Sequence, residues 1–118
     1  MTTLLVGIGG LAGVLARYGI TRATLHTDAL LWSTAAINLA GSFLLGLIVA
    51  GGWLSRDLSE AVGIGFLGGF TTFSTFTVQI VMETHGGRPG TAAAYLAVSV
   101  LGGLAAAVAG YSLGRVLT

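Results

Sequence analysis

Four long runs of apolar residues are separated by short clusters of charged residues along this chain. The charges fall within residues 17–28, 56–60 and 83–88 and at position 115, and the stretches between them contain almost no ionised side chain. Each stretch, as a helix rising about 1.5 Å per residue, is long enough to cross a hydrocarbon core of about 30 Å. The pattern therefore predicts four membrane-spanning helices, over about residues 2–23, 29–53, 61–82 and 91–117.

The runs do not alternate between apolar and polar residues. A transmembrane β-barrel needs that period of two, with turn clusters about every ten residues, whereas Phe43 to Ala50 is a continuous apolar and glycine stretch. We therefore expect an all-α, polytopic membrane protein in which residues 1–118 form a single transmembrane domain with both termini on one side. Because Met1 to Ala16 contains no Lys or Arg, we expect a retained first helix and not a cleaved signal peptide.

The composition points the same way. Of the 118 residues, 54% are hydrophobic and 8% are charged, whereas a soluble domain carries about 25% charged residues. Five basic and four acidic side chains are too few to cover the exterior of a soluble globule, which excludes a cytoplasmic enzyme. Cysteine is absent, which removes disulfides, thiolate metal sites and thiol nucleophiles. No catalytic Ser–His–Asp set, zinc-protease spacing or phosphate loop is present either, so we expect no enzymatic activity.

Glycine is unusually frequent. The chain has 20 glycines, about 17% of its residues against about 7% in typical proteins. Small residues recur four apart at Gly9 and Gly13, at Gly65 and Gly69, and at Gly102, Ala106, Gly110 and Gly114. Helices in lipid associate through such residues, because small side chains let the backbones approach closely. We expect four helices packed in this way to enclose no lumen, so that any transport path lies between subunits.

Basic loop residues are shared equally between the two sides of the predicted bundle. Arg56 and Arg115 lie on the side of the termini, Arg22 and Arg88 lie on the other side, and Arg17 is near a border. Because the bias of basic residues sets the orientation of small membrane proteins, this balance indicates a weak preference. It permits an antiparallel homodimer of oppositely inserted copies, and it leaves a single orientation open.

Several polar residues lie inside the predicted spans. Arg17 is about 22 Å along the first helix, either as a border residue that reaches the headgroups or as a fixed positive charge that attracts anions. Asn38 lies inside the second run, with Thr34 and Ser42 one turn away on the same face. A buried amide either bonds a neighbouring helix or belongs to a transport path. The file of three polar side chains favours the path.

The densest polar signal interrupts the third run near its middle, from Gly68 to Thr77 with the sequence GGFTTFSTFT. Glycine, serine and threonine tolerate unwinding within a membrane. Broken helices present carbonyl groups to cations and N–H groups to anions. The sequence therefore predicts a break in the third helix.

Two pairs of residues at helical spacing accompany this signal. Phe73 and Phe76 share a face if the turn is helical, and their electron-poor ring edges can flank an anion, although such pairs are more often lipid or core contacts. Tyr95 and Ser99 place two hydroxyl groups on one face of the fourth helix, with Gly103 next on that stripe. Tyrosine alone is weak support, because it is also a frequent interfacial anchor.

Three segments together resemble the Fluc (CrcB) family of fluoride channels. GGFTTFSTF at 68–76 closely resembles the signature of that family, GGLAGVLARY at 9–18 is similar to its GGxxGxxxRY pattern, and STAAINLAGSFLLG at 33–46 is similar to its second-helix pattern. The likeness covers all four helices at matching spacing. It implies an antiparallel, dual-topology homodimer in the bacterial inner membrane that exports fluoride passively through two pores between the subunits.

The resemblance also implies roles for individual residues. Phe73 and Phe76 resemble the phenylalanines that line each pore, and Asn38 resembles the pore asparagine. Other residues similar to pathway residues of the family are Ser74, Thr75, Tyr95 and Ser99, which resemble its hydroxyl track, and Arg17, which resembles its helix-one arginine. Gly68 and Thr71 correspond to the backbone carbonyls that hold a central structural sodium ion in such channels.

Two positions depart from the pattern of the family. Gly103 stands where some members have another hydroxyl group, so the hydroxyl track is expected to be shorter. Gln79 stands where an acidic residue often follows the signature, so the charge of a vestibule is expected to differ.

The chemistry of the polar residues agrees with this resemblance. Fluoride is small and strongly hydrated, so a path must offer hydrogen-bond donors as water is removed, and amide and hydroxyl groups are such donors. Two other functions stay open. A small four-helix, dimeric cation or drug antiporter would need an intramembrane carboxylate, whereas all four acidic residues lie at predicted borders, namely Asp28, Asp57, Glu60 and Glu83. A membrane scaffold without transport is the other.

Overall fold

The structure, a computed structural model, describes all 118 residues and contains only helices, turns and short links. The elements are α1 (Thr2–Thr24), α2 (Leu30–Gly51), α3 (Arg56–Glu60), the π-helical segment η1 (Ala61–Leu67), α4 (Gly68–Phe70), α5 (Phe73–His85) and α6 (Pro89–Val116). Four stretches are long and apolar enough to span a membrane: Thr2–Thr24, Leu30–Gly51, Arg56–His85 and Pro89–Val116. The prediction of an all-helical chain with four spans is therefore confirmed.

The third span begins at Arg56, about five residues before the expected start. Ser55 is the N-cap of α3, where its hydroxyl group accepts a hydrogen bond from the Leu58 N–H at 3.4 Å. Asp57 lies in the first turn, where a carboxylate interacts favourably with the partial positive charge of the helix N-terminus. The polar residues that suggest a loop are therefore the first turn of the helix.

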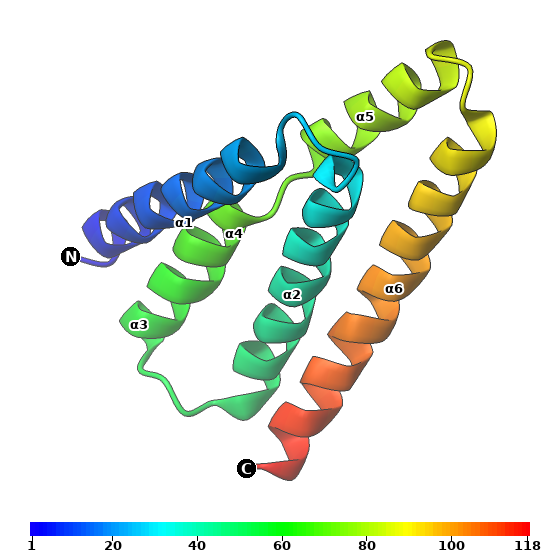
Figure 1. Cartoon of the computed structure of the whole chain (residues 1–118). Coiled ribbons are helices and arrows are strands. Elements are labelled where there is room, and N and C mark those ends of the chain that lie inside the picture. Colours follow the sequence, from blue (N-terminus) through cyan, green and yellow to red (C-terminus); the bar gives the residue numbers. More distant parts are fainter.

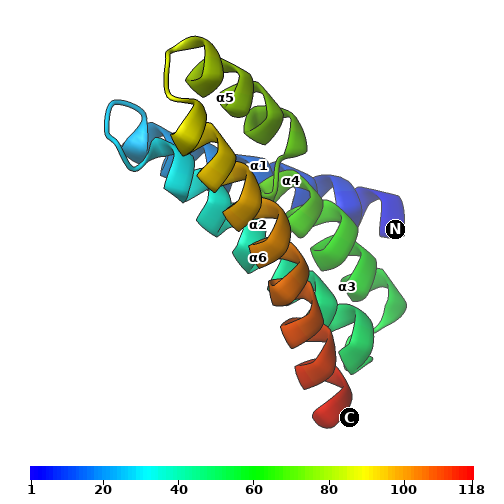
Figure 2. The same ribbon diagram turned by 90° about the vertical axis from the view of Figure 1, so that its right-hand side faces the viewer.

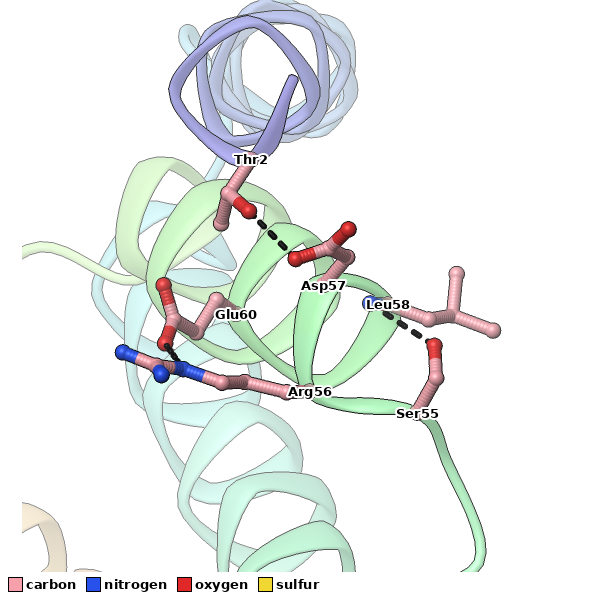
Figure 3. Close-up of polar contacts among 6 residues, drawn as sticks. All are labelled: Thr2, Ser55, Arg56, Asp57, Leu58 and Glu60. Carbon is pink, nitrogen blue, oxygen red and sulfur yellow. Dashed lines mark hydrogen bonds and ion pairs between the residues drawn. The ribbon is translucent and has the colours of Figure 1, made fainter.

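Both termini lie at the end of the molecule where α2 connects to α3. The Thr2 hydroxyl group donates a hydrogen bond to the Asp57 carboxylate, which ties the start of α1 to the start of α3 (Figure 3). At the other terminus, Gly114 of α6 packs against Gly51 at the end of α2, since a Cβ built on Gly114 would lie 3.1 Å from the Gly51 nitrogen. The structure therefore places both termini at the same end of the molecule, as four antiparallel spans require (Figure 1).

Helix α1 packs against η1 and α4 through glycines. Gly13 lies directly against the Phe66 carbonyl group, and a Cβ at Gly13 would come within 2.9 Å of the Phe70 nitrogen. A Cβ at Gly69 would lie 2.5 Å from the Gly10 carbonyl oxygen. Because side chains larger than hydrogen would collide with backbone there, the small residues set the spacing of the two helices, as predicted. We call this contact the α1 seam.

Helices α2 and α6 share the longest contact of the fold and run side by side for most of their length (Figure 1). A Cβ at Gly46 would lie 2.6 Å from the Ala107 carbonyl oxygen, and Gly110 lies directly against the Phe43 carbonyl group. We call this contact the α6 seam. The α1 seam joins the first span to the third, and the α6 seam joins the second span to the fourth.

The third span changes direction at two extended residues. Thr71 has φ −82° and ψ 159°, and Thr72 has φ −149° and ψ 122°, so the backbone between α4 and α5 is not helical (Figure 1). Beyond this link, α5 lies beside the first part of α6 (Figure 2). A small buried cluster forms at this end of the molecule from Leu31, Ala35, Phe76 and Tyr95.

Candidate ion path beside the interrupted helix

One side chain of α2 satisfies the backbone where the third span is extended. The Asn38 side chain donates from Nδ2 to the Thr72 carbonyl oxygen at 2.9 Å, and its Oδ1 accepts from the Thr72 N–H at 2.8 Å. In an uninterrupted helix that N–H would donate to the Gly68 carbonyl group. A peptide group left unpaired in hydrocarbon is costly, so Asn38 stabilises the extended conformation of Thr72.

Further hydrogen bonds form on both sides of the extended residues. The Gly69 carbonyl oxygen accepts a hydrogen bond from Arg17 Nε at 3.1 Å, which joins α1 to the same region. Thr72 is the N-cap of α5, because its hydroxyl oxygen accepts from the Thr75 N–H at 3.3 Å. The Thr72 hydroxyl group also donates to Thr75 Oγ1 at 3.0 Å. Arg17 and Thr75, both predicted as path residues, are thus engaged with the interrupted backbone.

These contacts leave two carbonyl groups without their helical donors. The Thr72 N–H would pair with the Gly68 oxygen in a continuous helix, and the Thr75 N–H would pair with the Thr71 oxygen, but both N–H groups bond elsewhere. Neutral carbonyl oxygens are ligands that hard cations accept. Gly68 and Thr71 therefore present two carbonyl oxygens of the kind that bind hard cations.

A cavity of about 410 Å³ opens beside the extended residues. Six of the predicted path and sodium-site residues line it together: Asn38, Gly68, Thr71, Phe73, Phe76 and Ser99. They come from α2, α4, α5, α6 and the link, so the fold gathers residues that lie far apart in the chain. We call it the break cavity.

The walls of the break cavity combine aromatic rings with a free hydroxyl group. The rings of Phe73 and Phe76 have centroids 6.0 Å apart and planes at 58°, but Phe76 is buried whereas Phe73 is 77% exposed. The hydroxyl oxygen of Ser99 is buried without a hydrogen-bond partner. Because buried hydroxyl groups normally have a partner, this one is available to a bound ion or water.

Thr34 and Tyr95 do not line this cavity and instead belong to a buried polar chain. The Tyr95 hydroxyl group donates to Gln79 Oε1 at 2.6 Å, and Gln79 Nε2 donates to Thr34 Oγ1 at 3.3 Å. The Tyr95 ring also packs edge-on against Phe76, with centroids 5.3 Å apart. The sequence marks Gln79 only as a departure, although its position three residues after Phe76 places it on the same face of α5.

Ser74 is a predicted path residue that lies away from the break cavity and from the interrupted backbone. It is exposed in the first turn of α5, and it does not line the surface cavities of about 410, 460 and 330 Å³. Its carbonyl oxygen accepts a hydrogen bond from the Thr77 hydroxyl group at 2.9 Å. Within one chain, the Ser74 side chain faces the surroundings of the helix and not the break cavity.

The cavity of about 330 Å³ lies on the other side of Gln79, toward the α1–α2 and α5–α6 connections. Its lining includes Asp28, Gln79, Glu83 and Arg88. Arg88 binds both carboxylate oxygens of Glu83, with Nε 2.7 Å from Oε2 and a terminal nitrogen 2.9 Å from Oε1. This hydrogen bonding with Glu83 raises the pKa of Arg88 above its ordinary value. No sequence pattern indicated that the pair would face a cavity.

Comparison with known proteins identifies the family. A family model described as "CrcB-like protein, Camphor Resistance (CrcB)" matches residues 4–111. The chain belongs to the CrcB family. It is a multi-pass membrane protein, with four spans that carry the residues described above.

Named relatives of this CrcB family member share nearly its whole length. The chain is 43% identical over 115 residues to the fluoride-specific ion channel FluC 2 of Moorella thermoacetica, with 94% of each chain covered. It is 39% identical over 120 residues to the fluoride-specific ion channel FluC 1 of Bacillus cereus, covering 97% of this chain and 88% of the relative. It is 38% identical over 122 residues to the fluoride-specific ion channel FluC of Novosphingobium aromaticivorans, covering 96% and 95%.

Proposed function

We propose that this chain forms a fluoride-selective channel through which fluoride leaves a bacterial cell passively across the inner membrane. The observation that carries the proposal is the lining of the break cavity, where Asn38 and the unpartnered Ser99 hydroxyl group lie beside Phe73 and Phe76. Relatives of similar length are named fluoride-specific ion channels, which supports the same function.

The lining suits a small anion that loses its water. One N–H of the Asn38 amide donates to Thr72, and the amide carries a second N–H that stays available. Together with the Ser99 hydroxyl group it offers donors in place of water, while the ring edges of Phe73 and Phe76 present their positive rim. No carboxylate lines the break cavity. An anion therefore meets neutral donors there without repulsion from a carboxylate.

We further propose that two copies of the chain assemble in antiparallel orientation and enclose two pores between them. Phe73 is 77% exposed although it lines the break cavity, so a second copy would cover an apolar ring and close the cavity. Loop arginines are balanced between the two ends of the molecule, which favours insertion in both orientations. The Ser74 side chain, exposed on α5, would then meet the partner and not the break cavity of its own chain.

We infer a central structural sodium ion from the two carbonyl groups that lack helical donors. Gly68 and Thr71 would hold it through their backbone oxygens, and a second antiparallel copy would supply the same pair. Such an ion adds positive potential beside the anion path. Asn38 and Arg17 contribute by holding Thr72 and Gly69 so that these oxygens stay free of helical bonds.

The test is fluoride efflux from liposomes that contain the purified protein, with chloride as the control ion. We expect fluoride flux without chloride flux, and we expect replacement of sodium by a larger organic cation to reduce the flux. Phe73→Ala should abolish fluoride flux and leave an intact dimer on gel filtration. Val81→Ala is the matched control, because Val81 is 55% exposed on the same helix and lines none of the three cavities.

Absence of fluoride flux from the unaltered protein would overturn the proposal. Proton-coupled efflux of an organic cation would instead support the four-helix antiporter, which the names of the relatives do not favour. A purely structural membrane scaffold is excluded if Phe73→Ala loses flux while the dimer persists.

A further inference from the structure

The cavity of about 330 Å³ connects the outside of the molecule to the buried polar chain. Asp28 comes from the α1–α2 connection, Glu83 from the last turns of α5, and Arg88 from the residues just before α6. Gln79 also lines this cavity and is only 9% exposed. The lining therefore runs from charged residues at the end of the bundle down to a buried amide. We call this cavity the Glu83 mouth.

A thin wall separates the Glu83 mouth from the break cavity. Gln79 lines the mouth and Phe76 lines the break cavity, and these residues lie one turn apart on α5. Tyr95 touches both, through the 2.6 Å hydrogen bond to Gln79 and the edge contact with Phe76. The Glu83 mouth is therefore the next cavity toward this end of the molecule, and the buried side chains of Phe76, Gln79 and Tyr95 lie between the two.

The charge at this mouth is unfavourable for an anion in its present arrangement. Asp28 and Glu83 each carry one negative charge and Arg88 carries one positive charge, which leaves the mouth at −1. Both Glu83 oxygens bind Arg88, so the single cation of the lining is already engaged. A negative opening lowers the local concentration of anions and slows their capture.

We propose that Arg88 is the anion-attracting residue of this mouth and that Glu83 restrains it, so that the ion pair sets the rate of fluoride capture. The inference rests on the proposed channel function and adds the residues that control access. The Arg88 side chain is 60% exposed, whereas that of Glu83 is 16% exposed, so the arginine is the partner that can turn toward an ion. The turn between them contains Gly86 and Gly87, the latter at φ +81°. The Arg88 N–H donates to the Glu83 carbonyl oxygen at 2.9 Å, so a reorientation of Arg88 needs only its side chain to rotate.

The test measures currents of the reconstituted full-length protein at low fluoride concentration and low ionic strength. One elementary charge several ångström from an ion in water changes the local ion concentration by about threefold. We expect Glu83→Gln to raise the fluoride current about threefold and Arg88→Gln to lower it about threefold. At about 1 M salt, where the Debye length is about 3 Å, both differences should vanish.

A double variant separates restraint from simple charge. If Glu83 acts by holding Arg88, Glu83→Gln should raise the current clearly less in a chain that already carries Arg88→Gln. An equal increase in both backgrounds would overturn the proposal. Arg88→Lys supplies a second measurement, because it keeps the charge and loses the two-point contact with Glu83; we expect a current above that of the unaltered protein.

Glu60→Gln is the matched control. Glu60 also binds an arginine on a helix, Arg56, at 3.0 Å (Figure 3), but neither residue lines any of the three cavities. The substitution removes the same charge at the opposite end of the fold, so we expect an unchanged current. If the unaltered protein conducts and Glu83→Gln behaves like Glu60→Gln, this inference fails while the channel function stands. If the unaltered protein does not conduct fluoride, both fail.

Discussion

The glycines of the two seams and the glycines Gly68 and Gly103 beside the break cavity have opposite roles in packing. In the seams, backbone meets backbone directly, and a Cβ at Gly13 or Gly110 would collide with a carbonyl group of the neighbouring helix. Near the break cavity, a Cβ at Gly68 or Gly103 would meet nothing within 4 Å. In the seams glycine therefore permits contact, whereas at Gly68 and Gly103 it leaves space. Gly41 also lines the break cavity but resembles the seam glycines, because a Cβ there would collide with the Thr71 methyl group. The difference teaches that glycine content alone does not reveal which positions hold the bundle together.

The largest effect of a single substitution is expected in the α1 seam. Gly13→Val would force two methyl groups into the Phe66 carbonyl group and the Phe70 nitrogen, and backbone cannot move aside as a side chain can. Overpacking typically costs about 1–3 kcal/mol even where side chains adjust, so we expect loss of assembled protein. Recovery of monodisperse protein on gel filtration in detergent is the measurement.

Gly7→Val is the control for that experiment, because a Cβ at Gly7 meets nothing within 4 Å on the same helix. Equal recovery of the Gly7 and Gly13 variants would show that the seam does not depend on close backbone approach.

The next largest effect is expected at the interrupted backbone. Asn38→Leu removes both partners of the Thr72 peptide groups, and an unsatisfied buried polar group costs about 1–3 kcal/mol. We expect the free energy of unfolding to fall by about 2–5 kcal/mol and fluoride flux to be lost. Thermal unfolding in detergent checks the first effect and liposome efflux the second.

Ser42→Ala serves as the comparison for Asn38→Leu. The Ser42 hydroxyl group donates only to the Asn38 carbonyl group of its own helix, at 2.7 Å, so its removal should shift stability by less than about 0.5 kcal/mol. Similar losses for both variants would contradict the special role of Asn38.

A smaller loss is expected in the buried polar chain. Tyr95→Phe leaves Gln79 Oε1 without its donor, which should cost about 1–2 kcal/mol. Tyr111→Phe is the control, because Tyr111 is 45% exposed on the same helix. The double variant Tyr95→Phe with Gln79→Leu should lose clearly less than the sum of the single losses. Strict additivity in thermal unfolding would show that the two side chains do not act together.

The smallest effect on stability is expected where glycine leaves space. Gly103→Ser places a hydroxyl group in the break cavity without a clash, so the free energy of unfolding should change by less than about 0.5 kcal/mol. Flux measurements would show whether a longer hydroxyl track alters fluoride passage. Gly110→Ser, about two turns further along α6, should in contrast destabilise the protein strongly. Its side chain would meet the Phe43 carbonyl group.

The positions of the charged residues predict the four spans, since ionised groups are costly and therefore rare in hydrocarbon. The start of the third span is less predictable, because Ser55 caps a first turn that carries Arg56 and Asp57 and looks like a loop. Local composition also marks the segment around Thr71 and Thr72. It does not reveal that Asn38 bonds Thr72, because those residues are 34 positions apart and meet only through the packing of α2.

The candidate site likewise contains residues that the sequence predicts and contacts that it does not. Residue types and helical spacing point to Asn38, Phe76 and Ser99, which share one cavity in the fold. The link from Gln79 to Thr34 and Tyr95 depends on the relative rotation of three helices, which spacing along one chain does not determine. The second copy and the sodium ion stay predictions, because a single chain contains neither.

The pairing of Asn38 with Thr72 has a consequence for how the protein comes to its final shape. A carboxamide has an acceptor and a donor arranged like those of a peptide group. The Asn38 side chain therefore pairs with Thr72 as a neighbouring backbone segment would. The local sequence permits the extended conformation of Thr72, and the packing of α2 against the third span stabilises it. Until the second span docks, the Thr72 peptide groups lack the Asn38 partner, so the angle between the two halves of the third span is expected to become fixed only on docking.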